Sequence, residues 1–147
     1  RVGGLILMAP HFFTEDMGIA AIVEARKAYE NTDLKSKLGR WHKDPDNAFK
    51  GWNGAWLDPG FRQWDITEQL AYIRVPILIV QGEDDQYGTV RQIEVAEREC
   101  YCPVEVALLP GAKHSPQREA TEATLKAVAE FARRAVEAGA QSPFIPA

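Results

Sequence analysis

Two apolar runs constrain the fold of this chain more than any other feature. Each run ends near a glycine that precedes an ionisable side chain. The first is VPILIVQGEDD (residues 75–85), which ends on Asp85, and the second is VEVALLPGAKH (residues 104–114), which ends on His114. Runs rich in β-branched residues with little polar alternation are typical of parallel strands covered on both faces. Side chains just beyond the carboxyl ends of such strands share one edge of the sheet. The sequence therefore predicts that Asp85 and His114 lie at the same edge.

The remaining segments complete an α/β pattern with a helical insertion. Residues 2–9 (VGGLILMA) read as a third parallel strand, covered like the other two. Helices are expected over Glu15–Glu30, Leu34–Trp41, Asp46–Leu57, Asp65–Ile73, Val90–Glu99 and Pro116–Glu137. This order of elements indicates an α/β fold with three parallel strands. Residues 1–10 and 74–138 would form its partial core, residues 11–73 the insertion, and residues 139–147 a flexible tail.

An acid and an imidazole at one sheet edge suit nucleophilic catalysis. The carboxylate can hold the imidazole in one tautomer, and the imidazole can then act as a general base. Each residue also has a structural interpretation, because Asp85 follows Glu83 and Asp84 and resembles an acidic helix N-terminus, while His114 resembles an exposed loop histidine. Glu83 or Asp84 could also replace Asp85 as the acid. The two strand ends taken together favour Asp85 and His114 as a catalytic pair.

Three segments in this order resemble the C-terminal half of an α/β-hydrolase-fold protein. PILIVQGEDDQY (residues 76–87) is similar to that family's penultimate strand and acid turn, and LPGAKHSP (residues 109–116) to its last strand and histidine loop. RVGGLILMAP (residues 1–10) resembles the strand before the family's cap insertion. The resemblance implies that Asp85 is the triad acid and His114 the base. It also implies a Ser-His-Asp hydrolase for a small apolar ester or a carbon–carbon bond.

The nucleophile of such a triad is missing from these 147 residues. No Gly-x-Ser-x-Gly motif, and no version of it with Cys or Asp, occurs in the sequence. Ser36, Ser115 and Ser142 lack the flanking glycines, and Ser115 is expected to cap the last helix. The resemblance places the elbow upstream of Arg1, so we expect the chain to be part of a larger protein. Whether the nucleophile is Ser, Asp or Cys stays open.

A non-catalytic binding protein with the same fold is the alternative. The missing nucleophile favours it. Lys113 also favours it, because many relatives have glycine at that position and a lysine adds bulk and positive charge beside the imidazole. A nucleophile elbow in the upstream coding sequence would distinguish the enzyme from the binding protein.

The insertion is rich in aromatic residues, including every tryptophan of the chain. Phe49, Trp52 and Trp56 have the i, i+3, i+7 spacing of a single helical face. This face either packs the insertion together or forms the apolar wall of a substrate pocket. The residues that we predict to contact substrate are Phe12, Phe13, Trp52 and Trp56. His11 could also line the pocket, although core or surface is the simpler interpretation.

Composition and charge exclude several other classes. A net charge of −4 with dispersed Lys and Arg argues against nucleic-acid binding, and no apolar stretch is long enough to cross a bilayer. No signal peptide is visible. Cys100 and Cys102 fit neither a zinc pair nor a redox motif, and free thiols are typical of a reducing cytoplasm. We therefore expect a cytoplasmic protein with no metal and no cofactor.

The strand at residues 2–9 predicts a partner. In the resembled fold another strand pairs with its outer edge, and an apolar strand left unpaired is prone to association. We expect this edge to pair with the N-terminal half of the fold or with a second copy of the chain.

Overall fold

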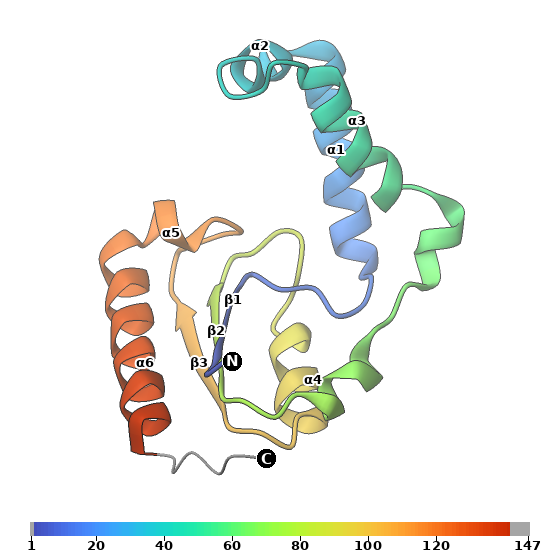
Figure 1. The fold of residues 1–147 in the computed structure, drawn as a ribbon. Helices are drawn as coiled ribbons and strands as arrows, with labels where there is room; N and C mark the ends of the chain where they lie inside the picture. The colour runs from blue at the N-terminus through green and yellow to red at the C-terminus, as the bar shows by residue number, and fades with distance from the viewer. Residues whose placement is uncertain (1, 142–147) are drawn as a thin grey trace. The chain divides into compact units, whose positions relative to one another are not determined.

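The structure is a computed structural model that describes residues 2–141, with side chains to Ala138. The chain divides into two compact units (Figure 1). The first unit combines the residues up to Phe12 with those from Ile66 onward, and the second comprises Phe13–Asp65. Among the described residues, no helix combines the length and the apolar character needed to cross a membrane.

A three-stranded parallel sheet forms the centre of the first unit. Its strands are β1 (Leu5–Met8), β2 (Ile77–Gly82) and β3 (Val104–Leu109), in the order β1-β2-β3. The register pairs Leu5 with Ile77, and Ile77 with Val104. Every residue of the central strand β2 is buried, which explains why its sequence is apolar with almost no alternation. The α/β class with three parallel strands is thus confirmed.

Helices cover both faces of this sheet, with α6 (Thr121–Gln141) on one side and α4 (Arg91–Glu99) on the other (Figure 1). Beneath α6, the Phe131 ring packs in one buried cluster with Leu78 and Val80. Because side chains alternate along a strand, Ile77 and Ile79 point to the opposite face. A short 3₁₀ helix, η2 (Thr67–Tyr72), packs against α4.

The C-terminal helical segment differs from the prediction. The expected single helix is two helices, α5 (Pro116–Glu119) and α6, because the backbone of Ala120 leaves the helical region at φ −140° and ψ 55°. The flexible tail was predicted to begin at residue 139, but α6 continues to Gln141. The remaining residues of that predicted tail, 142–147, lie outside the described residues.

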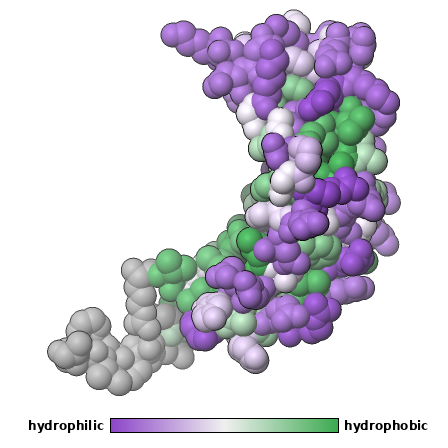
Figure 2. Space-filling model, turned by 90° about the vertical axis from the view of Figure 1, so that its right-hand side faces the viewer, coloured by the Kyte–Doolittle hydropathy of each residue, from purple (hydrophilic) through white to green (hydrophobic). Residues whose placement is uncertain are grey.

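The second unit is a helical segment whose first and last residues lie side by side. It contains α1 (Asp16–Asn31), α2 (Leu34–Leu38), α3 (Pro45–Trp56) and the 3₁₀ helix η1 (Pro59–Gln63). Phe13 and Asp65 form an antiparallel bridge, and the Thr14 N–H donates to the Trp64 carbonyl at 3.1 Å. Hydrophilic side chains dominate the α2 end of this unit, at the top of Figure 2.

The observed second unit is shorter than the predicted insertion of residues 11–73. At its start, the backbone N–H of Phe12 donates to the buried Gln92 side chain of α4 at 2.8 Å. At its end, η2 packs on α4 in place of the predicted α-helix over Asp65–Ile73. The first and last residues of the predicted insertion therefore belong to the sheet unit, because their hydrogen bonds and packing are made there.

Candidate active site

Asp85 and His114 meet at the carboxyl edge of the sheet, in the loops that follow β2 and β3. The His114 Nδ1 atom lies 2.9 Å from Asp85 Oδ2 and 3.1 Å from Asp85 Oδ1. The Asp85 side chain is 1% exposed and the His114 side chain 34% exposed. The carboxylate is therefore buried behind the imidazole. Since Nδ1 faces Asp85, Nε2 is the ring nitrogen that remains for proton transfer.

The loop after β2 holds the Asp85 carboxylate in one orientation. Its Oδ1 atom accepts hydrogen bonds from the backbone N–H groups of Tyr87, at 2.8 Å, and Gly88, at 3.3 Å. Burial raises the pKa of the Asp85 carboxyl, but the hydrogen bond to His114, the two backbone donors and the His114 charge outweigh it. The pKa of Asp85 is consequently lowered, and the group is a carboxylate at neutral pH.

Gly82 brings the two loops into direct backbone contact. A Cβ atom at this position would lie 2.2 Å from the carbonyl oxygens of both Ala112 and Lys113. Next to it, the Glu83 N–H donates to Leu109 O at 3.0 Å and the Asp84 N–H to Ala112 O at 2.9 Å. The absence of a side chain at Gly82 therefore permits the close approach of the two loops.

Glu119 is a site residue that the sequence analysis missed. Its carboxylate accepts from the backbone N–H groups of Lys113, at 2.8 Å, and Ser115, at 3.1 Å. These two groups flank His114, so the acid holds the histidine loop from both sides. Ser115 does occupy the N-cap position of α5, but its side chain makes no capping hydrogen bond, contrary to prediction. An acid in the first turn after the histidine was the available sequence signal.

Two further rings lie against His114. The Tyr87 ring contacts it edge-on, with centroids 4.8 Å apart, and the His11 ring lies at 5.7 Å. Ala9 has φ 45°, a strained value for a residue with a side chain, in the turn that leads from β1 to His11. The sequence interpretation of His11 as core or surface therefore missed its place beside the imidazole. The strained turn leaves no recognisable sequence signal.

The predicted substrate contacts are distributed over both units. Phe12 belongs to the sheet unit and is a core residue, 5% exposed. Phe13, Trp52 and Trp56 belong to the second unit. Within that unit, Trp52 contacts Phe49, and Trp56 contacts Phe61 and Trp64. Substrate contact by these four residues stays a prediction.

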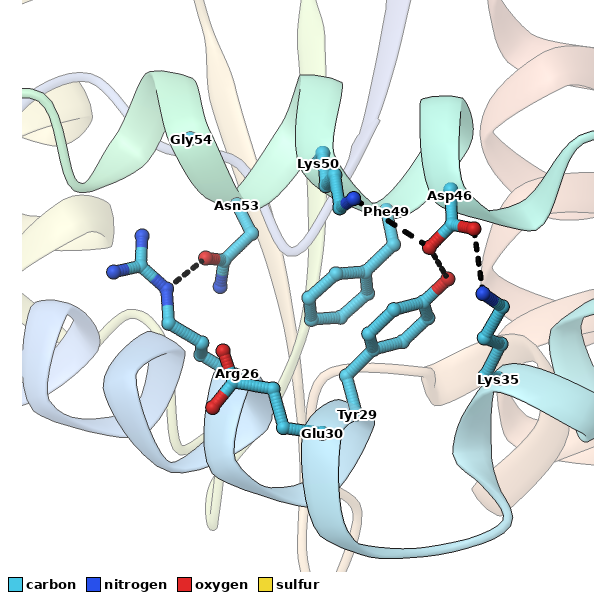
Figure 3. A pocket seen from close by; sticks show the side chains of 9 residues that line it. All are labelled: Arg26, Tyr29, Glu30, Lys35, Asp46, Phe49, Lys50, Asn53 and Gly54. Atoms are coloured by element: carbon cyan, nitrogen blue, oxygen red, sulfur yellow. Dashed lines mark hydrogen bonds and ion pairs between the residues drawn. The ribbon is translucent and has the colours of Figure 1, made fainter.

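The second unit contains an open cleft of about 550 Å³ between α1 and α3 (Figure 3). The Tyr29 and Phe49 rings stack at its centre, with centroids 3.9 Å apart. The Asp46 carboxylate accepts from the Tyr29 hydroxyl at 3.0 Å and from the Lys35 ammonium at 2.5 Å. These two hydrogen bonds, that from Lys35 first, lower the pKa of Asp46.

A buried amide also lines this cleft. The buried Asn53 accepts from Arg26 at 2.9 Å and donates to Ile22 O at 3.0 Å. Because these polar groups already bond to one another, we interpret the cleft as helix packing. Among the residues the structure describes, no cluster of three or more His, Cys, Asp and Glu could hold a metal ion.

No protein-family model matches the chain, and neither does any curated protein. Solved structures do match. NosK from Streptomyces actuosus is 19% identical with a TM-score of 0.68, over 91% of this chain and 59% of that one. A serine hydrolase involved in carbazole degradation (CarC) is 19% identical with a TM-score of 0.64, over 90% and 54%. A thermophilic esterase from Thermogutta terrifontis is 18% identical with a TM-score of 0.56, over 92% and 57%.

These likenesses establish the fold. The matched structures are α/β hydrolases, and the chain spans only about 54–59% of the length of these three. The chain therefore has the fold of the C-terminal part of an α/β hydrolase, as its three sequence segments suggested.

Proposed function

We propose that this chain supplies the acid and the base of a Ser-His-Asp hydrolase whose nucleophile lies on a segment outside these 147 residues. The observation that carries the proposal is the contact of His114 Nδ1 with both oxygens of a buried Asp85 carboxylate. An exposed loop histidine has no need of such a partner. The carboxyl edge of a parallel sheet is also where ligands bind in this class of fold.

The geometry supports a conventional division of labour between the two side chains. Asp85 accepts the Nδ1–H of His114 and so leaves the Nε2 lone pair available. Nε2 takes the proton of the nucleophile hydroxyl as the hydroxyl oxygen attacks the substrate carbonyl carbon, and then delivers that proton to the leaving group. Asp85 stays ionised throughout and stabilises the imidazolium that forms between the two steps.

The proposed substrate is a small, apolar ester or a compound with a carbon–carbon bond to be cleaved. Esterases and a serine hydrolase involved in carbazole degradation are among the structures that this chain resembles. The aromatic side chains of the second unit, including Trp52 and Trp56, are of the kind that line apolar pockets. By analogy with the fold, we propose that the second unit acts as a cap over the site.

A non-catalytic binding protein is the second candidate, and the observation that favours it is the missing nucleophile elbow. The side chain of Lys113, which also raised this possibility, is exposed and its backbone N–H is bonded to Glu119. Lysine at this position is therefore compatible with the observed His114 geometry.

Labelling with a serine-directed fluorophosphonate tests the proposal. The chain alone should stay unlabelled, and the chain joined to the protein segment that precedes it should be labelled stoichiometrically at the elbow serine. His114→Ala in the longer protein should strongly slow the labelling, because the base is lost. Stoichiometric labelling of the chain alone would contradict the placement of the nucleophile. An unlabelled longer protein would favour the binding protein or a different nucleophile.

We further propose that the outer edge of β1 pairs with the N-terminal half of the fold, or with a second copy when the chain is alone. Within the described residues β1 pairs only with β2, and Ile6 and Met8 are 37% and 44% exposed. Their register partners Leu78 and Val80 lie in the core beneath α6, so the apolar face extends past its covering helix.

Sedimentation velocity of the chain alone should therefore show concentration-dependent self-association. Met8→Lys should weaken it, because a charge on an edge strand opposes pairing. Val136→Lys is the matched control, since Val136 is also an exposed apolar residue, at 72%, but belongs to α6 and not to β1. A chain that stays monomeric at all concentrations would rule out the second-copy arrangement.

A further inference from the structure

We propose that Gln81 is a positioning residue for the Asp85 carboxylate, an inference that rests on the proposed function of the Asp85–His114 pair. Gln81 is the penultimate residue of β2, and its side chain is 1% exposed. It is the only polar side chain in this strand, whose other side chains are aliphatic. A polar amide at the end of a fully buried strand requires an explanation other than packing.

Packing alone would favour an apolar side chain at this position. An amide removed from water is costly unless its hydrogen bonds are replaced. In the part of the chain that the structure describes, the Gln81 Oε1 atom is buried and has no hydrogen-bond partner. A buried acceptor that is left unsatisfied lowers the stability of the folded state. The other polar atom of the amide, the Nε2 donor, does make hydrogen bonds.

The Nε2 donor of Gln81 binds the far end of the loop that carries Asp85 (residues 83–90), here called the acid loop. It donates to the carbonyl of Gly88 at 2.7 Å and more weakly to that of Thr89 at 3.3 Å. The N–H of the same Gly88 donates to Asp85 Oδ1. A continuous series of hydrogen bonds thus runs from Gln81 through Gly88 to the Asp85 carboxylate and on to His114 Nδ1.

Gly88 has little room to move within this series. A Cβ atom there would lie 3.0 Å from His11 Cε1 and 3.4 Å from Gln92 Cγ, so neighbouring side chains enclose it. The acid loop has no regular secondary structure of its own. The bond from Gln81 ties the end of this loop back to the strand from which it started. We infer that it keeps the Gly88 N–H, and with it the carboxylate, in the orientation that meets the imidazole.

Two substitutions of Gln81 separate positioning from packing. Gln81→Met keeps the size of the side chain and removes the donor. We expect the Nδ1 proton of His114, observed by low-field proton NMR, to exchange with solvent about tenfold faster, which corresponds to the loss of one hydrogen bond. The midpoint of urea unfolding should change little, because removal of the unsatisfied Oε1 acceptor offsets the hydrogen bond that the Gly88 carbonyl loses.

Gln81→Glu adds a pH-dependent readout. The introduced carboxyl is buried, which raises its pKa. When ionised it faces the Gly88 carbonyl without a proton to donate, and the His114 Nδ1 proton should exchange rapidly. When protonated at lower pH it regains a donor, and slow exchange should return. Wild-type protein over the same pH range provides the reference.

Asn53→Leu is the matched control, because Asn53 is also a buried amide, 2% exposed, but lies in the second unit. It should leave the His114 proton unchanged. Unchanged exchange in both Gln81 variants would overturn the proposal, as would an equal change in Asn53→Leu. These NMR readouts need no turnover. Failure of the proposed function would instead appear as an inactive longer protein whose Asp85–His114 pair still responds to Gln81.

Discussion

Asp85→Asn should lower kcat/KM of the protein joined to its nucleophile segment by about 10⁴-fold, because His114 can then no longer act as the general base although the structure changes little. The Asp85 carboxylate can only accept a hydrogen bond, so it selects the His114 tautomer that carries its proton on Nδ1. An amide can present its NH₂ group to Nδ1 and stabilise the opposite tautomer, whose Nε2 already carries a proton. Steady-state hydrolysis of a small activated ester measures the effect.

Asp84→Asn is the matched control for this substitution. Asp84 is the neighbouring residue and was an alternative candidate for the acid, but its side chain is exposed whereas that of Asp85 is buried. Its backbone N–H bond to Ala112 does not depend on the side chain. We expect Asp84→Asn to keep wild-type kcat/KM. A large loss in Asp84→Asn together with an active Asp85→Asn would transfer the role of acid to Asp84.

The same substitution has a consequence for stability at different pH values. The pKa of Asp85 is lowered in the folded protein, so its carboxylate contributes stability above the unfolded-state pKa of about 4. That contribution is lost as the pH falls through the lower folded-state pKa. Asp85→Asn should therefore be less stable than wild type at neutral pH, and the two should converge in acid. Urea unfolding at a series of pH values measures the convergence.

The sheet and the pair at its edge were predictable because their signals are local. The buried run before Gly82 indicated the central strand, and the position of Asp85 and His114 just past two parallel strands placed them at one edge. The interruption near the start of the last predicted helix was not predictable. The backbone leaves the helical region at Ala120, although alanine itself favours a continuous helix.

The supporting residues of the site were not predictable, because their roles depend on contacts between distant segments. His11 reaches His114 through a strained turn at Ala9, which no residue preference indicates. Gln81 and Glu119 both act on backbone groups of loops whose paths are fixed only in the folded chain. Polar residues in such places are visible in a sequence, but their partners are not.

Gly82→Ala should lower the free energy of unfolding by about 3 kcal/mol or more, at the upper end of what overpacking costs. The added Cβ would lie 2.2 Å from two backbone carbonyl oxygens, those of Ala112 and Lys113. Flexible side chains can move away from such a contact, but these atoms belong to the histidine loop itself. Relief requires that loop to move away from β2. The midpoint of urea unfolding of the variant measures the cost.

Gly51→Ala is the control, because Gly51 lies inside α3 and a Cβ atom there would meet nothing within 4 Å. It should raise stability by about 1 kcal/mol through helix propensity. The two substitutions add the same methyl group, so opposite signs would locate the cost of the first in the contact between the loops. Any Gly82→Ala protein that still folds should also lose the slowly exchanging His114 Nδ1 proton, since Asp85 and His114 are carried by the two loops forced apart. Wild-type stability in Gly82→Ala would show that these loops do not touch as described.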